Sequence, residues 1–490
     1  MTKRLLTGSA GIIGIGLSLL AAQASAQGTA KMNGTPSPAQ VRYGYPQTPV
    51  EGAAKEFDLS RPITINDAVA IALLRQNSIA IAKAGTDASR AQVVQARSPY
   101  FPQITPGYTY SSNVQPISGA GAASGIAHGE NVTDQITLRQ TIWDGGKREA
   151  NLQQARNSLD ASQFNLGNTR QTVILSVTQD YYTLLRDQKL IQVQQVSVDQ
   201  AKQTLDSINE QVAVGNAAKT APYQAQSDYA NAQVALLQAQ NVAEVDDATL
   251  KNAMGVSTSS PLILAPPNLP AVVPTPDPRT LESYVQQSFE NRLDLKQQQS
   301  LINAQSDLLR VARLQAGIAI SASIDEGYQF QPSSGEQRAF VVSFSYPLFD
   351  GGSSRAAVRS AEAQLAIQER TLDQLEQGVR LAVEQDYLTR ELSRQQVQAA
   401  DKAEIAGEKN WQAAEGELKY GVINILDSIN ARLQLITAQV NQVNALYNFY
   451  IANARLLRDI GSNDPGFASV MPVLKGAAAT TLAVSTKVTK

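Results

Sequence analysis

Four stretches of the chain alternate apolar and polar residues with a period of two, and each therefore predicts a half-buried β-strand. They lie at about 101–110, 132–142, 317–330 and 339–348. The apolar face of the first stretch holds Ile104, Pro106, Tyr108 and Tyr110. Each stretch has roughly 8–12 residues, which is the length of a tilted transmembrane strand. A soluble β-sandwich has the same period and stays open as an alternative.

A long proline-free segment, 146–213, predicts an α-helix of unusual length. Its apolar residues recur every seventh position, at Val177, Leu184, Ile191, Val198, Leu205 and Val212. This heptad spacing is typical of coiled-coil packing, and such a helix would be roughly 100 Å long. An equivalent helix is expected at 353–420. A soluble coiled-coil rod is one interpretation, whereas the many Ala, Gln and Ser residues favour a wall of closely packed helices.

Both long helices are expected to end at a glycine, because glycine fits the position that terminates a helix. Return helices are predicted at 220–254 and 424–460, with Thr220 and Asn424 as their N-caps. Asp427 then falls at the third helical position, where a carboxylate stabilises the first turn.

The chain repeats itself at a constant spacing of 206 residues, which indicates an internal duplication. The stretch TIWDGGKREA returns as PLFDGGSSRA. The matching residues are Asp144 with Asp350, Gly215 with Gly421, and Gly255 with Gly461. A looser match farther upstream pairs Asn77 with Asn291 at a spacing of 214 residues.

Each repeat is predicted to hold a helix, two strands, a long helix and a return helix. In the first repeat the initial helix is expected from Ile65 to Arg97, where Ser98-Pro99 ends it, and a long loop from Ser111 to Asp134. The expected organisation is a signal peptide at 1–26, a flexible extension at 27–60, the first repeat at 61–255, a proline-rich connector at 256–279, the second repeat at 280–461 and a C-terminal tail at 462–490.

The first 26 residues fit an export signal. Lys3 and Arg4 precede an apolar stretch, and Ala24-Ser25-Ala26 satisfies the small-x-small rule for cleavage. No later stretch supplies the ~20 continuous apolar residues of a transmembrane helix.

The composition removes most kinds of chemistry. The 490 residues include no cysteine and one histidine, His128, so disulfides, cysteine zinc sites and multi-histidine metal sites are excluded. His128 lies in a Gly/Ala/Ser-rich stretch and is expected in a solvated loop. No acid–base or nucleophile constellation is present, so neither an enzyme nor a cofactor is expected. The net charge is −2 and no basic run occurs, so nucleic acid is not an expected partner.

Four strands per chain leave open sheet edges. Open edges are a liability in water and do not occur in lipid, where a sheet must close. The smallest membrane barrels have about 8 strands. A membrane sheet built from this chain therefore requires at least two copies, and three copies would supply twelve strands.

The repeat, the paired WDGG and FDGG junctions, and the hairpin ends VGN and YGVINILDSINARLQL together resemble the TolC-like outer membrane efflux proteins (outer membrane factors) of Gram-negative bacteria. The resemblance covers about Ile63 to Gly461. It implies a mainly α fold with a small β part: a homotrimer whose 12-stranded transmembrane β-barrel lies in outer membrane lipid and continues as a long periplasmic α-helical barrel. The family works with a periplasmic adaptor protein and an inner-membrane transporter.

Carried onto this chain, the resemblance makes the hairpin ends Val214, Gly215, Tyr420 and Gly421 the expected adaptor-contacting tips. Asp427 matches a position where the family often carries an acid that lines the periplasmic gate. A second acid often follows three residues later, where this chain has Asn430, and the first repeat has Ala221 at the place of Asp427. The helix-capping interpretation of Asp427 stays open beside the gate.

The junctions where a strand meets a long helix are expected to act as hinges. Their residues are Asp144, Gly145, Gly146, Asp350, Gly351 and Gly352. Glycine permits the sharp turn, and each aspartate is suited to cap the helix that follows. Trp143 and Phe349, just before the junctions, fit an interfacial aromatic belt.

The resemblance thus implies an outer membrane channel of a tripartite efflux system, which is expected to be a passive exit duct for small molecules. The same architecture would serve as the outer membrane component of type I protein secretion. A soluble periplasmic coiled-coil scaffold is the alternative of another class. A channel requires Phe344, Tyr346 and Leu348 to face lipid, which a scaffold does not.

Overall fold

The structure, a computed structural model, describes residues 61–117, 125–215, 218–265, 279–331, 334–420 and 422–462, all of which belong to the unit from Asp58 to Lys490. The predicted signal peptide, the N-terminal extension, most of the connector and nearly all of the C-terminal tail lie outside the described residues. Among the helices that are described, none is both long and apolar enough to cross a membrane.

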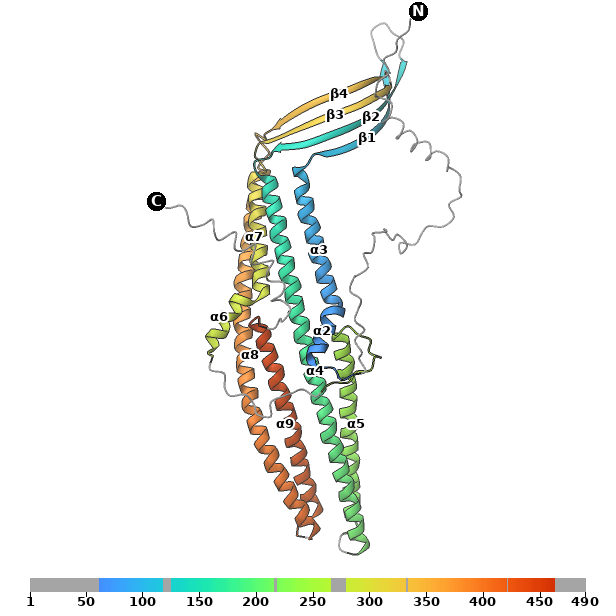
Figure 1. The fold of residues 1–490 in the computed structure, drawn as a ribbon, viewed down its shortest axis with the longest axis vertical. Coiled ribbons are helices and arrows are strands. Elements are labelled where there is room, and N and C mark those ends of the chain that lie inside the picture. Colours follow the sequence, from blue (N-terminus) through green and yellow to red (C-terminus); the bar gives the residue numbers. More distant parts are fainter. Residues whose placement is uncertain are drawn as a thin grey trace, which may run out of the picture. The chain divides into compact units, whose positions relative to one another are not determined.

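The described elements follow the same order twice. The first series consists of α2 (Ile65–Arg75), α3 (Asn77–Arg97), the short 3-10 helix η2 (Ser98–Tyr100), β1 (Gln103–Ile117), β2 (Gly125–Trp143), α4 (Lys147–Ala213) and α5 (Ala221–Ala253). The second consists of α6 (Leu281–Asn291), α7 (Leu293–Leu314), β3 (Ala319–Gln331), β4 (Gly335–Ser345), α8 (Ser353–Lys419) and α9 (Ile425–Asp459). The fold is mainly helical with one small sheet (Figure 1), and the prediction of this fold class with an internal duplication is confirmed.

Helix α4 lies at the centre of the helical layer. It packs against α2, α3, α5, α7 and α9, and Figure 1 shows it between its neighbours. Its heptad residues Val177, Leu184 and Val198 are buried. Tyr181 is also buried, and its hydroxyl donates to the carbonyl oxygens of Ile63 (3.0 Å) and Ala265 (2.9 Å). Helix α4 thereby holds the start of the first repeat against the beginning of the connector.

The single first helix predicted from Ile65 to Arg97 is wrong, because the chain forms two helices with a break at Gln76. The backbone of Gln76 is extended (φ −69°, ψ 123°). Its side-chain amide accepts from Asn77 N (2.8 Å) and donates to the carbonyl oxygens of Asn252 (3.3 Å) and Ala253 (3.0 Å). The break is thus stabilised by the end of α5, which lies far away in sequence.

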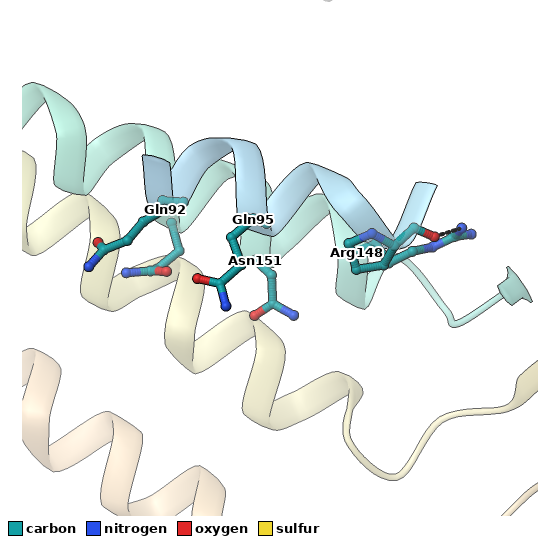
Figure 2. Close-up of a pocket in the computed structure, with 8 residues that line it drawn as sticks. Gln92, Gln95, Arg148 and Asn151 are labelled. Carbon is teal, nitrogen blue, oxygen red and sulfur yellow. Dashed lines mark hydrogen bonds between the residues drawn. The ribbon is translucent and has the colours of Figure 1, made fainter. Parts of the chain in front are cut away.

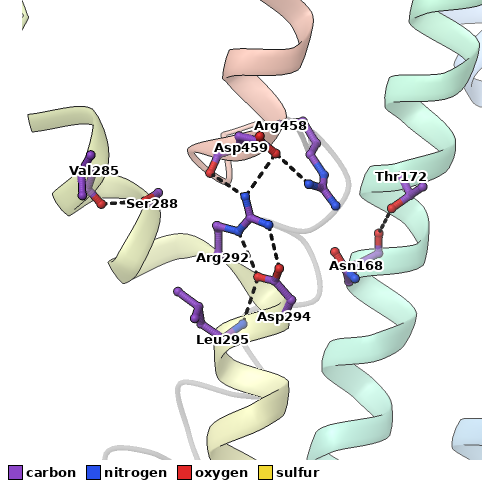
Figure 3. A network of polar contacts seen from close by, with 9 residues as sticks. All are labelled: Asn168, Thr172, Val285, Ser288, Arg292, Asp294, Leu295, Arg458 and Asp459. Atoms are coloured by element: carbon purple, nitrogen blue, oxygen red, sulfur yellow. Dashed lines mark hydrogen bonds and ion pairs between the residues drawn. The ribbon is translucent and has the colours of Figure 1, made fainter. Parts of the chain in front are cut away.

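The second repeat breaks its first helix at Arg292 (φ −61°, ψ 130°). The Arg292 guanidinium is buried and donates to Asp294 (Nη2–Oδ2, 2.7 Å) and to Asp459 at the end of α9 (Nη1–Oδ1, 3.1 Å). Figure 3 shows Arg458 reaching the same Asp459 carboxylate. Because the breaks fall at Gln76 and Arg292, the equivalent helix ends are Arg75 and Asn291, and the predicted pairing of Asn77 with Asn291 is wrong by two residues.

The four strands form one antiparallel sheet in the order β1-β2-β3-β4, so β1 and β4 are its edges. One row across the sheet is apolar, with Ile104 opposite Leu138, Leu138 opposite Ile324, and Ile324 opposite Phe340. The next row is polar and places Thr137 beside Asp325, with a 2.7 Å hydrogen bond between them. The predicted alternation of faces is therefore present in the sheet.

Two strand ends differ from the prediction. The expected loop from Ser111 to Asp134 is wrong in its outer parts, because β1 continues to Ile117 and β2 starts at Gly125. His128 accordingly lies in β2 opposite Val114, not in a loop. Backbone pairing within a hairpin outweighs a composition that disfavours strands. At the other end, β4 stops at Ser345, two residues before Pro347, which has no N–H for the strand ladder.

Candidate functional site

Each strand-to-helix junction is a tight turn made by two consecutive glycines. Gly145 and Gly146 have φ values of 68° and 90°, and Gly351 and Gly352 have 66° and 91°. This left-handed backbone is disfavoured for residues with a side chain. The two junctions therefore have nearly identical backbone conformations, and glycine is required in them by geometry.

The aspartate before each glycine pair caps the helix that follows. Asp144 accepts from the backbone N–H groups of Gly146 (3.2 Å) and Arg148 (2.9 Å). In the second junction Asp350 accepts from Gly352 (3.0 Å) and Ser354 (2.8 Å) in the same way. The carboxylates thus satisfy N–H groups that have no partner within the first turn of α4 and α8.

Arg148, which the sequence analysis did not single out, stabilises the first junction and has no counterpart in the second. Arg148 donates to the carbonyl oxygens of Pro99 (3.3 Å), Thr141 (2.9 Å) and Ile142 (3.1 Å). Its guanidinium also lies over the ring of Tyr100, 5.1 Å from the centroid. The corresponding residue of the second repeat is Ser354. Comparing the residues that follow the two GG pairs would have revealed this difference.

A polar hollow of about 400 Å³ lies beside the first junction, between α3 and α4. Figure 2 shows Gln92 and Gln95 on one helix, and Asn151 and Arg148 on the other. Arg148 is fully occupied by the junction. The remaining lining is made of neutral amides and small residues, which offer no acid–base pair.

The predicted tips lie at the far ends of the long helices from the junctions. A helix of 67 residues separates the junction from the tip in each repeat, which is about 100 Å. Val214 and Tyr420 end α4 and α8, and their side chains are 71% and 83% exposed. Gly215 has a φ of 84° and closes the turn. Gly421 lies outside the described residues.

The gate candidates lie in the first turns of α9. Asp427 and Asn430 are both exposed in the single chain. Asn424 caps the helix through a 3.0 Å hydrogen bond from Asp427 N to its side-chain oxygen. Asn424 therefore supplies the cap, and the Asp427 carboxylate is directed to solvent.

Thr220 does not cap α5 with its side chain, contrary to the prediction. Its backbone is helical (φ −86°, ψ −18°), whereas a capping threonine has an extended backbone that brings its hydroxyl to the N–H of the first turn. Pro222 also removes one of the N–H groups that such a cap would serve.

Arg432, two residues after Asn430, ties the two helix hairpins together and was missed in the sequence. It projects from α9 and is 2% exposed. It donates to the carbonyl oxygen and hydroxyl of Ser197 on α4, both at 3.0 Å, and forms an ion pair with Asp228 on α5. The pair connects α8–α9 to α4–α5 close to the gate candidates.

Comparisons with known proteins show the same division into two repeats. A family model described as "Outer membrane efflux protein" matches residues 68–256 and 284–462, which are more than half of the chain and correspond to the two repeats. Outer membrane protein TolC of Escherichia coli (strain K12) is 22% identical over 398 residues, which cover 77% of this chain and 78% of that protein. Outer membrane efflux protein BepC of Brucella suis biovar 1 (strain 1330) is 23% identical over 381 residues, with 77% and 81% covered.

Solved structures share the fold. The Campylobacter jejuni CmeC outer membrane channel matches with a TM-score of 0.73 at 17% identity, covering 83% of this chain and 88% of that chain. The outer-membrane channel OprN matches with a TM-score of 0.71 at 18% identity, covering 84% and 95%.

Proposed function

The chain belongs to the outer membrane efflux protein family, and from this premise we propose that three copies assemble into one passive exit duct for small molecules. Its place is the Gram-negative outer membrane, from which it extends into the periplasm. Efflux through such a duct needs no chemistry by the chain itself. What it needs is a closed wall with a polar interior, and the repeat supplies the parts of that wall.

The open sheet is the observation that carries the proposal. Its edges β1 and β4 have no partner strand within the described chain. On its apolar face Ile104, Phe340 and Phe344 are 66%, 70% and 66% exposed. An apolar face of this kind fits lipid, and in lipid the edges must be paired. Joining β4 of one copy to β1 of the next closes the sheet, and three copies give a barrel of twelve strands.

The helices support the same head-to-tail assembly. In the described part of the chain, helix α8 packs mainly against α6, α7 and α9, whereas the equivalent helix α4 packs against five helices. Ile367, Leu381 and Leu388 on α8 are more than half exposed and are spaced by multiples of seven. Such a stripe fits coiled-coil packing against another helix. If α8 meets the α3–α5 edge of the next copy, the contact is heterologous and closes into a ring.

The tips and the gate complete the proposal. Val214, Gly215 and Tyr420 are proposed to contact a periplasmic adaptor, which links the duct to an inner-membrane transporter. Three copies would bring three Asp427 carboxylates to the narrow end of the helical barrel. Asn430 would leave this ring with a single acidic layer.

A deletion strain tests the function. Loss of the gene is expected to sensitise the cell to small toxic compounds, and the wild-type gene is expected to restore resistance. Loss of an exported protein with unchanged compound sensitivity would assign the chain to protein secretion instead. Release of the mature protein from membranes by carbonate would contradict a channel of either kind and favour a soluble scaffold.

Gly351→Val is expected to reduce the yield of the trimer. Valine strongly disfavours the φ of 66° at this position, so the sheet would leave α8 at the wrong angle to meet its neighbours. The readout is the mass of the detergent-extracted particle by light scattering after size exclusion. Gly129→Val is the control, because Gly129 lies in the inner strand β2, its φ is not left-handed, and an added Cβ would make only an ordinary 3.8 Å contact with the carbonyl oxygen of Asn113. Equal trimer yields in the two variants would contradict a conformational requirement at the junction.

A further inference from the structure

A buried carboxylate oxygen without a hydrogen-bond partner in the described chain lies where α4 packs against α5, a contact that we call the seam. Asp187 on α4 is 2% exposed. Its Oδ1 accepts from Arg186 Nε at 2.8 Å and lies 2.8 Å from Arg186 Nη2. Its Oδ2 is buried and has no hydrogen-bond partner within the part of the chain that the structure describes. An ionised carboxylate in this position would bear the full desolvation cost on one oxygen.

The seam has more negative than positive groups. Asp246 on α5 faces Asp187, and its Oδ2 lies 4.0 Å from Arg186 Nη2. Asp180 lies two turns earlier on α4, where burial and the charge of Asp246 raise its pKa. The next acid on α5, Asp247, is already paired with Lys251. Two carboxyl groups therefore share the Arg186 guanidinium, and Asp180 adds a third acid nearby.

Several charged and titratable groups on the other elements that pack against α4 have partners of their own. Asp67 of α2 accepts from Thr64, Asp87 of α3 pairs with Arg90, Asp307 of α7 accepts from Asn157, and Tyr450 of α9 stacks on Tyr182. These contacts add no positive charge to the seam. The positive charge that lowers the pKa of Asp187 is that of Arg186 on its own helix.

One bound proton would both give the unpaired Oδ2 of Asp187 a hydrogen bond and reduce the excess negative charge between α4 and α5. On Oδ2 of Asp187 it removes one charge and converts the orphaned acceptor into a donor toward Asp246. Burial, followed by the neighbouring Asp246, raises the pKa of Asp187 to about 6, as expected for two carboxyl groups that share a site. A hollow of about 540 Å³ lies between the same two helices and is lined by Gln188 of α4 and Ala243 of α5 among others.

We propose that the α4–α5 seam is fastened by a proton held between Asp187 and Asp246, and that the hairpin loosens when this proton leaves at higher pH. The sign follows from the direction of the shift. The folded chain binds the proton more tightly than the unfolded chain, so the contribution is full below the ordinary carboxyl pKa of 3.8 and is lost as the pH rises through about 6. The hairpin that responds is the one that ends at Val214 and Gly215.

Asp187→Asn tests the proposal, because an uncharged amide reproduces the protonated acid and donates to Asp246. Hydrogen exchange is compared between the full-length variant and wild type in detergent, at the same pH. At pH 8 the α5 amides around Asp246 are expected to exchange more slowly in the variant. The pKa rise from 3.8 to about 6 corresponds to a difference of up to about a hundredfold. At pH 5, between the ordinary pKa and the raised one, the difference is expected to shrink to about tenfold.

Asp246→Asn removes the other acid of the pair and is expected to slow exchange at pH 8 in the same way. Asp87→Asn is the control, since this exposed side chain is 55% accessible and pairs with Arg90 on the surface. Faster or unchanged α5 exchange at pH 8 in both seam variants would overturn the proposal, as would a difference from wild type of equal size at pH 5 and pH 8. Because hydrogen exchange is measured within one hairpin, neither outcome bears on the proposed duct function, which is tested separately by the deletion strain.

Discussion

Arg432→Met is expected to lower the free energy of unfolding by about 3–5 kcal/mol, because it leaves the carboxylate of Asp228 buried without its partner. The two side chains are 3% and 11% exposed in the pair. Methionine fills a similar volume, so the loss comes from charge and hydrogen bonding more than from packing. The measurement is denaturant unfolding in detergent followed by circular dichroism.

Two further variants separate a buried ion pair from a general effect of losing an arginine. Arg313→Met removes a pair with Glu362 in which the side chains are 59% and 50% exposed, and it is expected to cost at most about 1 kcal/mol. The double variant Arg432→Met with Asp228→Leu removes both charges and is expected to recover much of the loss. A double variant as unstable as the single one would show that packing against Ser197 dominates.

The loss of unfolding free energy in Arg432→Met is also expected to depend on pH. In the wild type, burial raises the pKa of Asp228 and Arg432 lowers it. Without the arginine only the upward effect of burial is left, so the folded pKa lies farther above the unfolded value. A group of this kind stabilises at low pH and loses its contribution as the pH rises through the folded pKa. Arg432→Met is therefore expected to be closer to wild type at pH 5 than at pH 8.

The contacts of Arg432 also show what could not be predicted from the sequence. The strand period of two and the heptads of α4 are local patterns, and the sheet and the long helices follow them. The partners of Arg432 lie 235 and 204 residues away, so nothing near it in the sequence distinguishes it from an exposed arginine on a helix. The same holds for Asp187, whose partner Asp246 belongs to the return helix.

The helix breaks were missed for a related reason. Gln76 and Arg292 are ordinary helix formers, and no proline or glycine marks either position. Each break is stabilised from outside, by the carbonyl oxygens of Asn252 and Ala253 in one repeat and by Asp459 in the other. In contrast, the glycine pairs of the junctions were recognised, since a left-handed turn leaves its requirement in the sequence itself. The role of the tips and of Asp427 depends on partner copies and stays a prediction.

Gly255→Ala and Gly461→Ala are each expected to destabilise the protein by about 2–6 kcal/mol, because two separate costs add. Both glycines have positive φ values, 69° and 73°, which cost a residue with a Cβ about 1–3 kcal/mol. A Cβ on Gly255 would also lie 2.9 Å from the backbone C and O atoms of Arg75, and one on Gly461 would lie 2.7 Å from Cβ of Asn291. Relieving such overlap costs about 1–3 kcal/mol more.

These two glycines seat the end of each return helix against the break in the first helix of its repeat. The atoms that an added Cβ would strike are largely backbone, which cannot swing aside as a long side chain does. Gly378→Ala is the matched control: no atom lies within 4 Å of its Cβ position and its φ is not left-handed, so alanine is expected to stabilise α8 by about 0.5–1 kcal/mol. Unfolding of all three variants is compared under the same conditions. If Gly255→Ala and Gly461→Ala behaved like Gly378→Ala, the contact between the return helix and the helix break would not be close-packed. These glycines would then not be what fixes the position of the break in each repeat.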